Sequence, residues 1–170
     1  MNKVRASLLA LLLLCIAILL QSTILGRIAI ASVRPDIALI ILVFVSLRRG
    51  SMVGQISGFA SGILEDFMSV SPLGFHPLMR AVIGYIYGRF SGTVFVDPFL
   101  MPMILTAVAT LLKGLLSGLV STLFGITSSG FLYFAGRLWI EMGYNAVLSP
   151  FLFAALNLIK TFRQAEKEGT

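Results

Sequence analysis

The chain has 170 residues, of which 58% are hydrophobic and only 12% are charged, and its net charge is +6. Soluble domains carry roughly 25% charged residues, and the mean hydropathy here is +0.98, so the composition excludes a soluble globular domain. It predicts an all-α integral membrane protein with a single domain over residues 1–170. The basic residues stand at the ends of apolar segments, which indicates membrane topology and anionic lipid and argues against nucleic acid.

The first apolar segment, about Ala6 to Gly26, follows a basic start. No small-x-small cleavage site stands before Arg27, so we expect a retained first helix and not a removed signal peptide. The single cysteine, Cys15, lies inside this segment. It cannot form an intrachain disulfide, and no clustered ligands accompany it, so we expect a small core residue. No metal and no other cofactor is predicted.

Five further apolar segments follow, and a helix needs about 20 residues to cross the hydrocarbon layer. They cover about Asp36 to Leu47, Ser51 to Ser69, Pro77 to Phe90, Pro98 to Gly125 and Gly136 to Ile159. The sequence therefore predicts a polytopic membrane bundle of about six transmembrane helices. The second and fourth segments are short, so five crossings are the alternative.

The second segment begins with "RPD". Pro35 suits the first turn of a helix, where its missing N–H has no partner to lose. Asp36 beside it meets the positive end of the helix dipole. A helix start is the favoured interpretation, and contact with a partner is the alternative.

The basic residues give an orientation, because cytoplasmic loops carry an excess of Lys and Arg. With six crossings and both termini in the cytoplasm, four basic groups fall on the cytoplasmic side. They are Lys3 and Arg5, Arg48 and Arg49, Arg89, and Lys160, Arg163 and Lys167. Arg27 and Arg34 fall on the other side and count against this orientation. We still predict it, and the turn at Arg48 and Arg49 would then touch partners or lipid.

Small residues recur at every fourth position in three segments, and residues four apart share one helix face. These faces are Gly50, Gly54, Gly58 and Gly62, then Gly84 and Gly88, then Thr106, Thr110, Gly114, Gly118 and Thr122. Lipid supplies little hydrophobic force between helices, so association depends on the close packing that small residues allow. Packing within the bundle is the favoured interpretation, and one face left over for a partner is the alternative.

Charged side chains inside a bilayer are costly and are usually paired or functional. Glu65 and Asp66 close the third segment, and we expect Asp66 to pair with Arg80 near the start of the fourth. Lys113 lies in the middle of the fifth segment and needs a buried partner, for which Glu141 or Glu65 is available. A structural ion pair is favoured for Lys113 over a role in transport.

The sequence predicts no enzyme. It contains no visible Ser/His/Asp or Cys/His arrangement and no phosphate-binding loop. Glu65 and Asp66 are adjacent, so on a helix they point about 100° apart and do not face one substrate. His76, the single histidine, is expected to be an ordinary polar residue in a stiff loop that contains Pro72 and Pro77.

The chain resembles the rod shape-determining protein MreD family over nearly its whole length. The resemblance rests on "LLQSTIL", "RPDIALIILVFVSLRRG" and "GQISGFASGILEDFMSVSPLGFHPL". The last stretch is the most specific, because it is a glycine-spaced helix that ends in Gly-hydrophobic-hydrophobic-x-Asp and is followed by Pro-Leu-Gly. The matching positions are Pro35, Asp36, Arg49, Gly50, Gly54, Gly58, Gly62, Asp66 and Gly74. From Phe95 onward the match is one of hydropathy and length only.

The resemblance implies a multi-pass protein of the bacterial inner membrane that is not an enzyme. It implies partners of the elongation machinery: MreC, the actin-like MreB, RodA and a class B penicillin-binding transpeptidase. It also implies a compact bundle similar to the S components of energy-coupling-factor transporters. The expected function is a scaffold that supports rod shape and lateral peptidoglycan synthesis through helix contacts with MreC. The alternative is a small-molecule carrier of the S-component type, with a polar pocket at Glu65, Asp66, His76, Arg80 and Glu141.

Overall fold

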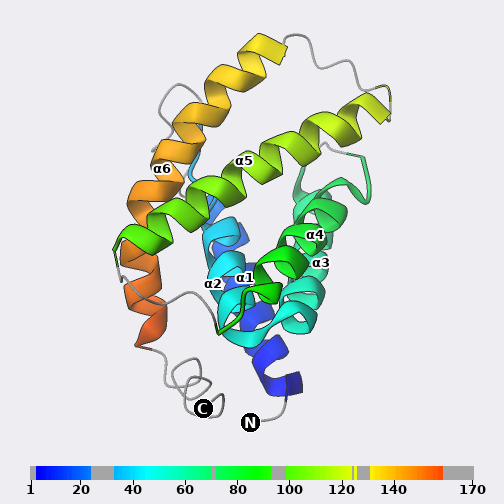
Figure 1. Ribbon diagram of the computed structural model, residues 1–170. Coiled ribbons are helices and arrows are strands. Elements are labelled where there is room, and N and C mark those ends of the chain that lie inside the picture. Colours follow the sequence, from blue (N-terminus) through cyan, green and yellow to red (C-terminus); the bar gives the residue numbers. More distant parts are fainter. Residues whose placement is uncertain are drawn as a thin grey trace.

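The computed structural model describes residues 3–23, 33–69, 72–92, 99–123, 125 and 131–158. Over these residues the chain forms six α-helices (Figure 1). They are α1 (Lys3–Thr23), α2 (Ile37–Arg49), α3 (Ser51–Met68), α4 (Phe75–Arg89), α5 (Leu100–Leu123) and α6 (Phe131–Asn157). The all-α fold and the expected number of helices are confirmed.

The helix bounds differ from the expected ones by a few residues at most ends. The fourth helix begins at Phe75, two residues before Pro77, because a proline is accommodated within the first turn of a helix. The sixth helix begins at Phe131, five residues before Gly136. Several expected features lie outside the described residues: Gly26, Arg27, Pro98, Ile159, Lys160, Arg163 and Lys167.

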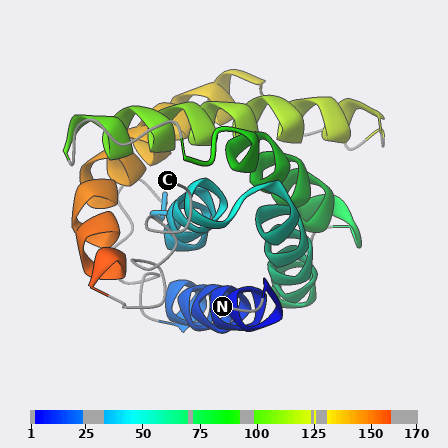
Figure 2. The ribbon, with the colours of Figure 1, turned by 60° about the horizontal axis from the view of Figure 1, so that its bottom comes forward.

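Helix α2 is the centre of the bundle. Seen from the end, it is surrounded by the other five helices (Figure 2), and it contacts each of them. All ten residues from Ala38 to Leu47 are buried, which is typical of a helix that is apolar on every side. Phe44 packs edge-on against Phe153 of α6, with ring centroids 5.1 Å apart. The second apolar segment therefore forms the core.

Helices α3 and α4 form a hairpin whose backbones touch along the glycines. A Cβ added at Gly58 would overlap the carbonyl of Arg80, and one added at Gly62 would overlap the backbone of Pro77. Gly54 and Gly84 meet each other in the same way. This close approach is what small residues permit in a helix pair.

Gly50 does not belong to that packed face, contrary to the expectation from its spacing. It joins α2 to α3 with a φ of +86°, and an added Cβ would meet nothing within 4 Å. A φ in this range suits glycine because a side chain would clash with the backbone. Its role is therefore to let the chain turn between two helices.

Helices α5 and α6 form a second hairpin that crosses the first four helices at a slant (Figure 1). A Cβ on Gly114 would lie 2.7 Å from Cδ1 of Leu138 in α6, whereas one on Gly118 would meet nothing within 4 Å. Thr106 and Thr110 are fully buried. The small-residue face of α5 is thus partly used inside the bundle and partly open.

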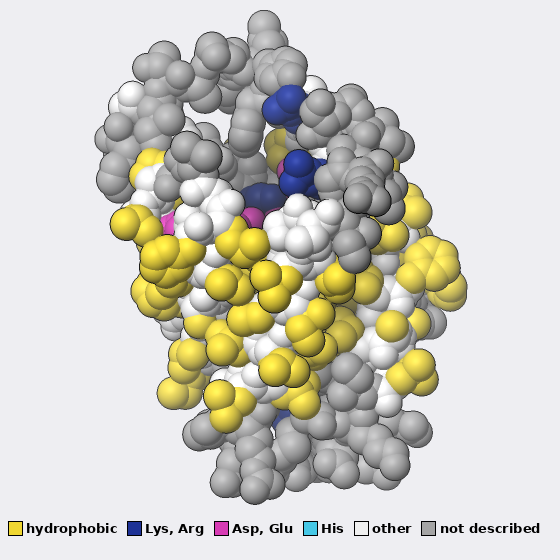
Figure 3. Space-filling view, turned by 180° about the vertical axis from the view of Figure 1, so that it is seen from behind, with side chains coloured by type: hydrophobic (Ala, Val, Ile, Leu, Met, Phe, Trp, Pro, Cys, Tyr) yellow, Lys and Arg dark blue, Asp and Glu magenta, His cyan; other side chains and the backbone are white. Residues whose placement is uncertain are grey.

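The outer helices turn large apolar side chains away from the bundle, and these cover much of the face in Figure 3. Examples are Leu12 in α1, Phe59 in α3, Leu115 in α5 and Phe151 in α6. Among the described helices, only α5 is long and apolar enough over Leu100–Thr122 to cross a membrane by length and composition, and Ser7–Thr23 is a shorter apolar helix. Six crossings therefore stay a prediction.

The two ends of the bundle differ in charge. Arg48 donates to Asn157 at 2.8 Å, and the backbone of Gly88 meets that of Ser51, so Arg48, Arg49 and Arg89 share one end. Asp36 precedes α2 and lies at the other end. With 13 residues, α2 is about 20 Å long, whereas the 21 residues of α1 span about 32 Å. Helix α2 is therefore about 12 Å shorter than α1, and a cavity lies over its N-cap Asp36.

Candidate functional site: the charged cluster around Asp36

Asp36 is the N-cap of α2. Its Oδ1 accepts a hydrogen bond from the N–H of Leu39 at 2.9 Å, which satisfies one of the unpaired donors of the first turn. Its own N–H donates to Oδ1 of Asn145 in α6 at 2.8 Å. The helix start predicted from "RPD" is therefore confirmed at Asp36, but Pro35 precedes the cap and does not lie in the first turn, which begins at Ile37. The cap is also held by a residue of another helix.

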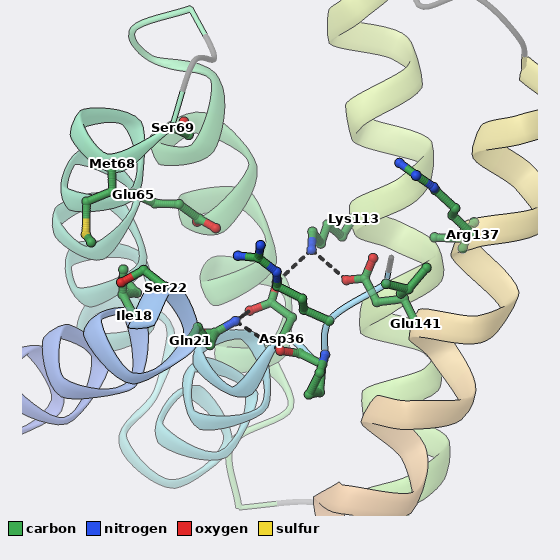
Figure 4. A pocket seen from close by; sticks show the side chains of 14 residues that line it. Ile18, Gln21, Ser22, Asp36, Glu65, Met68, Ser69, Lys113, Arg137 and Glu141 are labelled. Atoms are coloured by element: carbon green, nitrogen blue, oxygen red, sulfur yellow. Dashed lines mark hydrogen bonds and ion pairs between the residues drawn. The ribbon is translucent and has the colours of Figure 1, made fainter. Parts of the chain in front are cut away.

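The carboxylate of Asp36 also receives three side chains. Lys113 Nζ lies 2.6 Å from Oδ2, Arg80 Nη2 lies 3.4 Å from Oδ1, and Gln21 Nε2 donates to Oδ1 at 3.3 Å. Figure 4 shows Gln21 and Lys113 reaching Asp36 from opposite sides. Asp36 is only 4% exposed, and a buried charge needs this degree of compensation.

Two further carboxylates complete what we call the Asp36 cluster: Gln21, Asp36, Glu65, Arg80, Lys113 and Glu141. Glu141 Oε1 lies 2.6 Å from Lys113 Nζ, and Glu65 Oε2 lies 2.6 Å from Arg80 Nε. Each of the six helices or its cap contributes one of these residues. The cluster therefore joins the whole bundle at one point.

The predicted Asp66–Arg80 pair is wrong. Asp66 accepts from the N–H of Gly74 at 2.6 Å and from the N–H and Nδ1 of His76 at 3.1 and 2.6 Å, while Arg80 pairs with Glu65. The reason is the turn of about 100° between adjacent helical residues, which aims Glu65 at the cluster and Asp66 at the loop. For Lys113, the predicted partner Glu141 is confirmed, and Asp36 is an additional one.

Sequence reasoning missed two residues of this region, Gln21 and Asn145. Gln21 also accepts from the N–H of Ala38 at 3.0 Å, and Asn145 donates to Oγ1 of Thr110 at 3.0 Å. The signal available in the sequence was a Gln and an Asn inside apolar segments, because amide side chains in such segments form hydrogen bonds across helices. What the sequence does not give is which helices those bonds reach.

A cavity of about 440 Å³ opens over the cluster. Figure 3 shows basic and acidic side chains inside this hollow. Its lining consists of Ile18, Gln21, Ser22, Val33, Arg34, Pro35, Asp36, Glu65, Met68, Ser69, Lys113, Arg137, Leu138 and Glu141. Of the pocket residues expected from the sequence, Glu65 and Glu141 line it. Asp66, His76 and Arg80 do not. Asp66 of α3 and His76 at the start of α4 are bonded to each other, and Arg80 pairs with Glu65.

The chemistry of the cluster is that of paired charges. Among the described residues, no group of three or more His, Cys, Asp or Glu side chains is placed to hold a metal ion. Glu65 and Glu141 reach toward the cavity from α3 and α6 (Figure 4), and each is held by a cation. The arrangement can fix helices together, and it can present charged groups to whatever enters the cavity.

Comparison with known proteins decides the family. The family model described as rod shape-determining protein MreD matches residues 1–159. The chain belongs to the MreD family. No curated protein and no solved structure matches it.

Membership of the MreD family assigns the protein a role in rod shape determination and places it among membrane proteins. The family positions recognised in the sequence now have structural roles. Asp36 caps α2 and anchors the cluster, and Asp66 holds the loop before α4. Gly74 in that loop has a φ of +96°, a left-handed conformation that suits glycine.

Proposed function

We propose that this MreD protein is a non-enzymatic membrane scaffold of the cell-elongation machinery. It supports rod shape and lateral peptidoglycan synthesis by holding MreC, and through it MreB, RodA and a class B penicillin-binding transpeptidase. The observation that carries the proposal is the use of the buried charges. Lys113 and Arg80 form ion pairs between helices. The cluster therefore stabilises the helix bundle, and the outer faces of the bundle can contact other proteins.

The orientation we propose is multi-pass, with both termini in the cytoplasm. The end that carries Arg48, Arg49 and Arg89 faces the cytoplasm and its anionic lipid, as the excess of basic residues on that side favours. The cavity then faces the periplasm. Arg34, which counted against this orientation, lines the cavity. An arginine that is part of a cavity is a weak indicator of membrane topology.

Gly118 is the small residue we propose for the partner face. The glycines of α3 and α4 are already covered, whereas a Cβ on Gly118 would meet nothing within 4 Å. A neighbouring transmembrane helix gains van der Waals contact where a backbone is open in this way. Gly143 of α6 is equally open and lies on another helix, so it provides a matched control.

The test is copurification of MreC with the full-length protein in mild detergent. We expect wild type and Gly143→Leu to retain MreC, and Gly118→Leu to lose most of it while keeping its own level and thermal stability. Failure of the wild-type protein to retain MreC would refute the scaffold. Equal retention by both variants would remove Gly118 from the partner face.

A carrier of the S-component type is the second candidate, and the cavity over Asp36 is the observation that favours it. Its size falls within the range of roughly 300–1,000 Å³ found for small-molecule sites. A small ligand that copurifies with the protein in the absence of MreC would support the carrier over the scaffold.

A further inference from the structure

The Asp36 cluster is not electrically balanced by its own members. It contains three carboxylates, Asp36, Glu65 and Glu141, and two cations, Arg80 and Lys113. The cavity as a whole is not negative, because Arg34 and Arg137 also line it. A carboxylate has about four acceptor sites, so Glu65 and Glu141 can each take a further positive donor.

The cluster also has hydrogen-bonding capacity to spare. Lys113 Nζ has three donors, and its two bonds go to Asp36 and Glu141. The side chains of Glu65 and Glu141 remain 24% and 19% exposed. Donors and acceptors with unused hydrogen-bonding capacity bind water or a polar ligand.

Two arginines add positive charge to the lining of the cavity. Arg34 and Arg137 both line it and are both exposed. Arginine is suited to carboxylate and phosphate groups, because its planar guanidinium donates two parallel hydrogen bonds. The cavity is thus lined by charged side chains of both signs.

We propose that this cavity binds a small zwitterion of the amino acid or short peptide class. Its ammonium group faces the carboxylates of Glu65 and Glu141, and its carboxylate faces Arg34. The apolar lining, which includes Ile18 and Leu138, contacts the carbon skeleton. A simple anion also meets the carboxylates, and a simple cation also meets Arg34, so either one alone satisfies only half of the site.

The experiment measures the thermal unfolding midpoint of the full-length protein in detergent with three matched probes. Alanyl-alanine carries both charges, N-acetyl-alanyl-alanine carries only the carboxylate, and alanyl-alanine amide carries only the ammonium. A ligand that binds the folded state raises the midpoint as its concentration exceeds Kd. We expect a rise of a few degrees with millimolar alanyl-alanine and a much smaller one with either capped probe.

Two variants test the place of binding. Arg34→Gln removes an exposed charge, and Ser22→Trp fills the cavity from α1, so both should fold and lose the response to alanyl-alanine. Arg89→Gln, which removes an exposed charge at the opposite end of the bundle, should keep it. Equilibrium dialysis with radiolabelled alanyl-alanine gives a second reading that does not depend on stability.

Three outcomes overturn the proposal: no shift and no retained label with alanyl-alanine, equal shifts with a capped probe, or an unchanged response in Arg34→Gln and Ser22→Trp. The proposal is independent of the scaffold, because MreC retention is measured separately. A protein that holds MreC without binding the dipeptide refutes the zwitterion site alone. One that binds the dipeptide without holding MreC refutes the scaffold alone.

Discussion

At the scale of single residues, Asp36 does more than the sequence indicated. A capping aspartate normally satisfies donors of its own helix, but this one also receives Lys113 and Arg80 and is tied through its N–H to Asn145. Removing one partner of a buried charge pair is more costly than removing both, because the remaining charge is left without compensation.

Asp36→Asn is therefore expected to lower the free energy of unfolding by about 3–5 kcal/mol. The double variant Asp36→Asn/Lys113→Met should recover part of this loss, since it removes the orphaned ammonium as well. The measurement is thermal or denaturant unfolding of the wild type, both single variants and the double variant in the same detergent. Strictly additive losses would show that the two residues do not interact.

Asp66 carries a second residue-scale prediction. Its carboxylate accepts three hydrogen bonds from Gly74 and His76, so Asp66→Ala removes all three, at about 1–3 kcal/mol in total. The expected result is a lower unfolding midpoint, with Gln55→Ala on the exposed side of the same helix as control. A midpoint equal to that of the control would mean that the loop holds without this carboxylate.

At the scale of elements, the spacing of small residues predicted close helix packing but not which glycines take part. The α3–α4 hairpin uses Gly54, Gly58 and Gly62, whereas Gly50 turns the chain and Gly118 stays open. Periodicity places residues on a face, and only the fold shows what lies against that face.

Gly58→Ala and Gly118→Ala should consequently change stability in opposite directions. The methyl group at position 58 overlaps the carbonyl of Arg80, and overpacking of this kind typically costs about 1–3 kcal/mol. At position 118 the methyl meets nothing, so the higher helix propensity of alanine should stabilise by about 0.5–1 kcal/mol. The measurement is the unfolding midpoint of each variant relative to the wild type. A shift of the same sign in both would contradict the packing described for α3 and α4.

Only part of the site was predictable, because a sequence pattern places residues on a helix face without showing what packs against that face. Hydropathy and charge gave the number of helices, the helix start at Asp36 and the need of Lys113 for a carboxylate. They did not give Gln21, Asn145 or the exchange of roles between Glu65 and Asp66, because these depend on how the helices are rotated and set in height against one another.

At the scale of the whole molecule, the arginine end and the cavity end lie on opposite sides of the bundle. With Cys15 replaced by serine, single cysteines at Arg89 and at Ser69 should react differently with a membrane-impermeant maleimide. In intact spheroplasts we expect labelling at position 69, which lines the cavity, and none at position 89 until the membrane is opened. The reverse pattern would invert the proposed orientation.

The shortness of α2 has an electrical consequence. A transmembrane voltage falls across the insulating part of a membrane, and moving one charge through 100 mV involves about 2.3 kcal/mol. Where water fills the cavity down to Asp36, that insulating part narrows along the bundle axis to the roughly 20 Å of α2. The steepest field in the molecule then runs through its central, buried helix and begins at the Asp36 cluster.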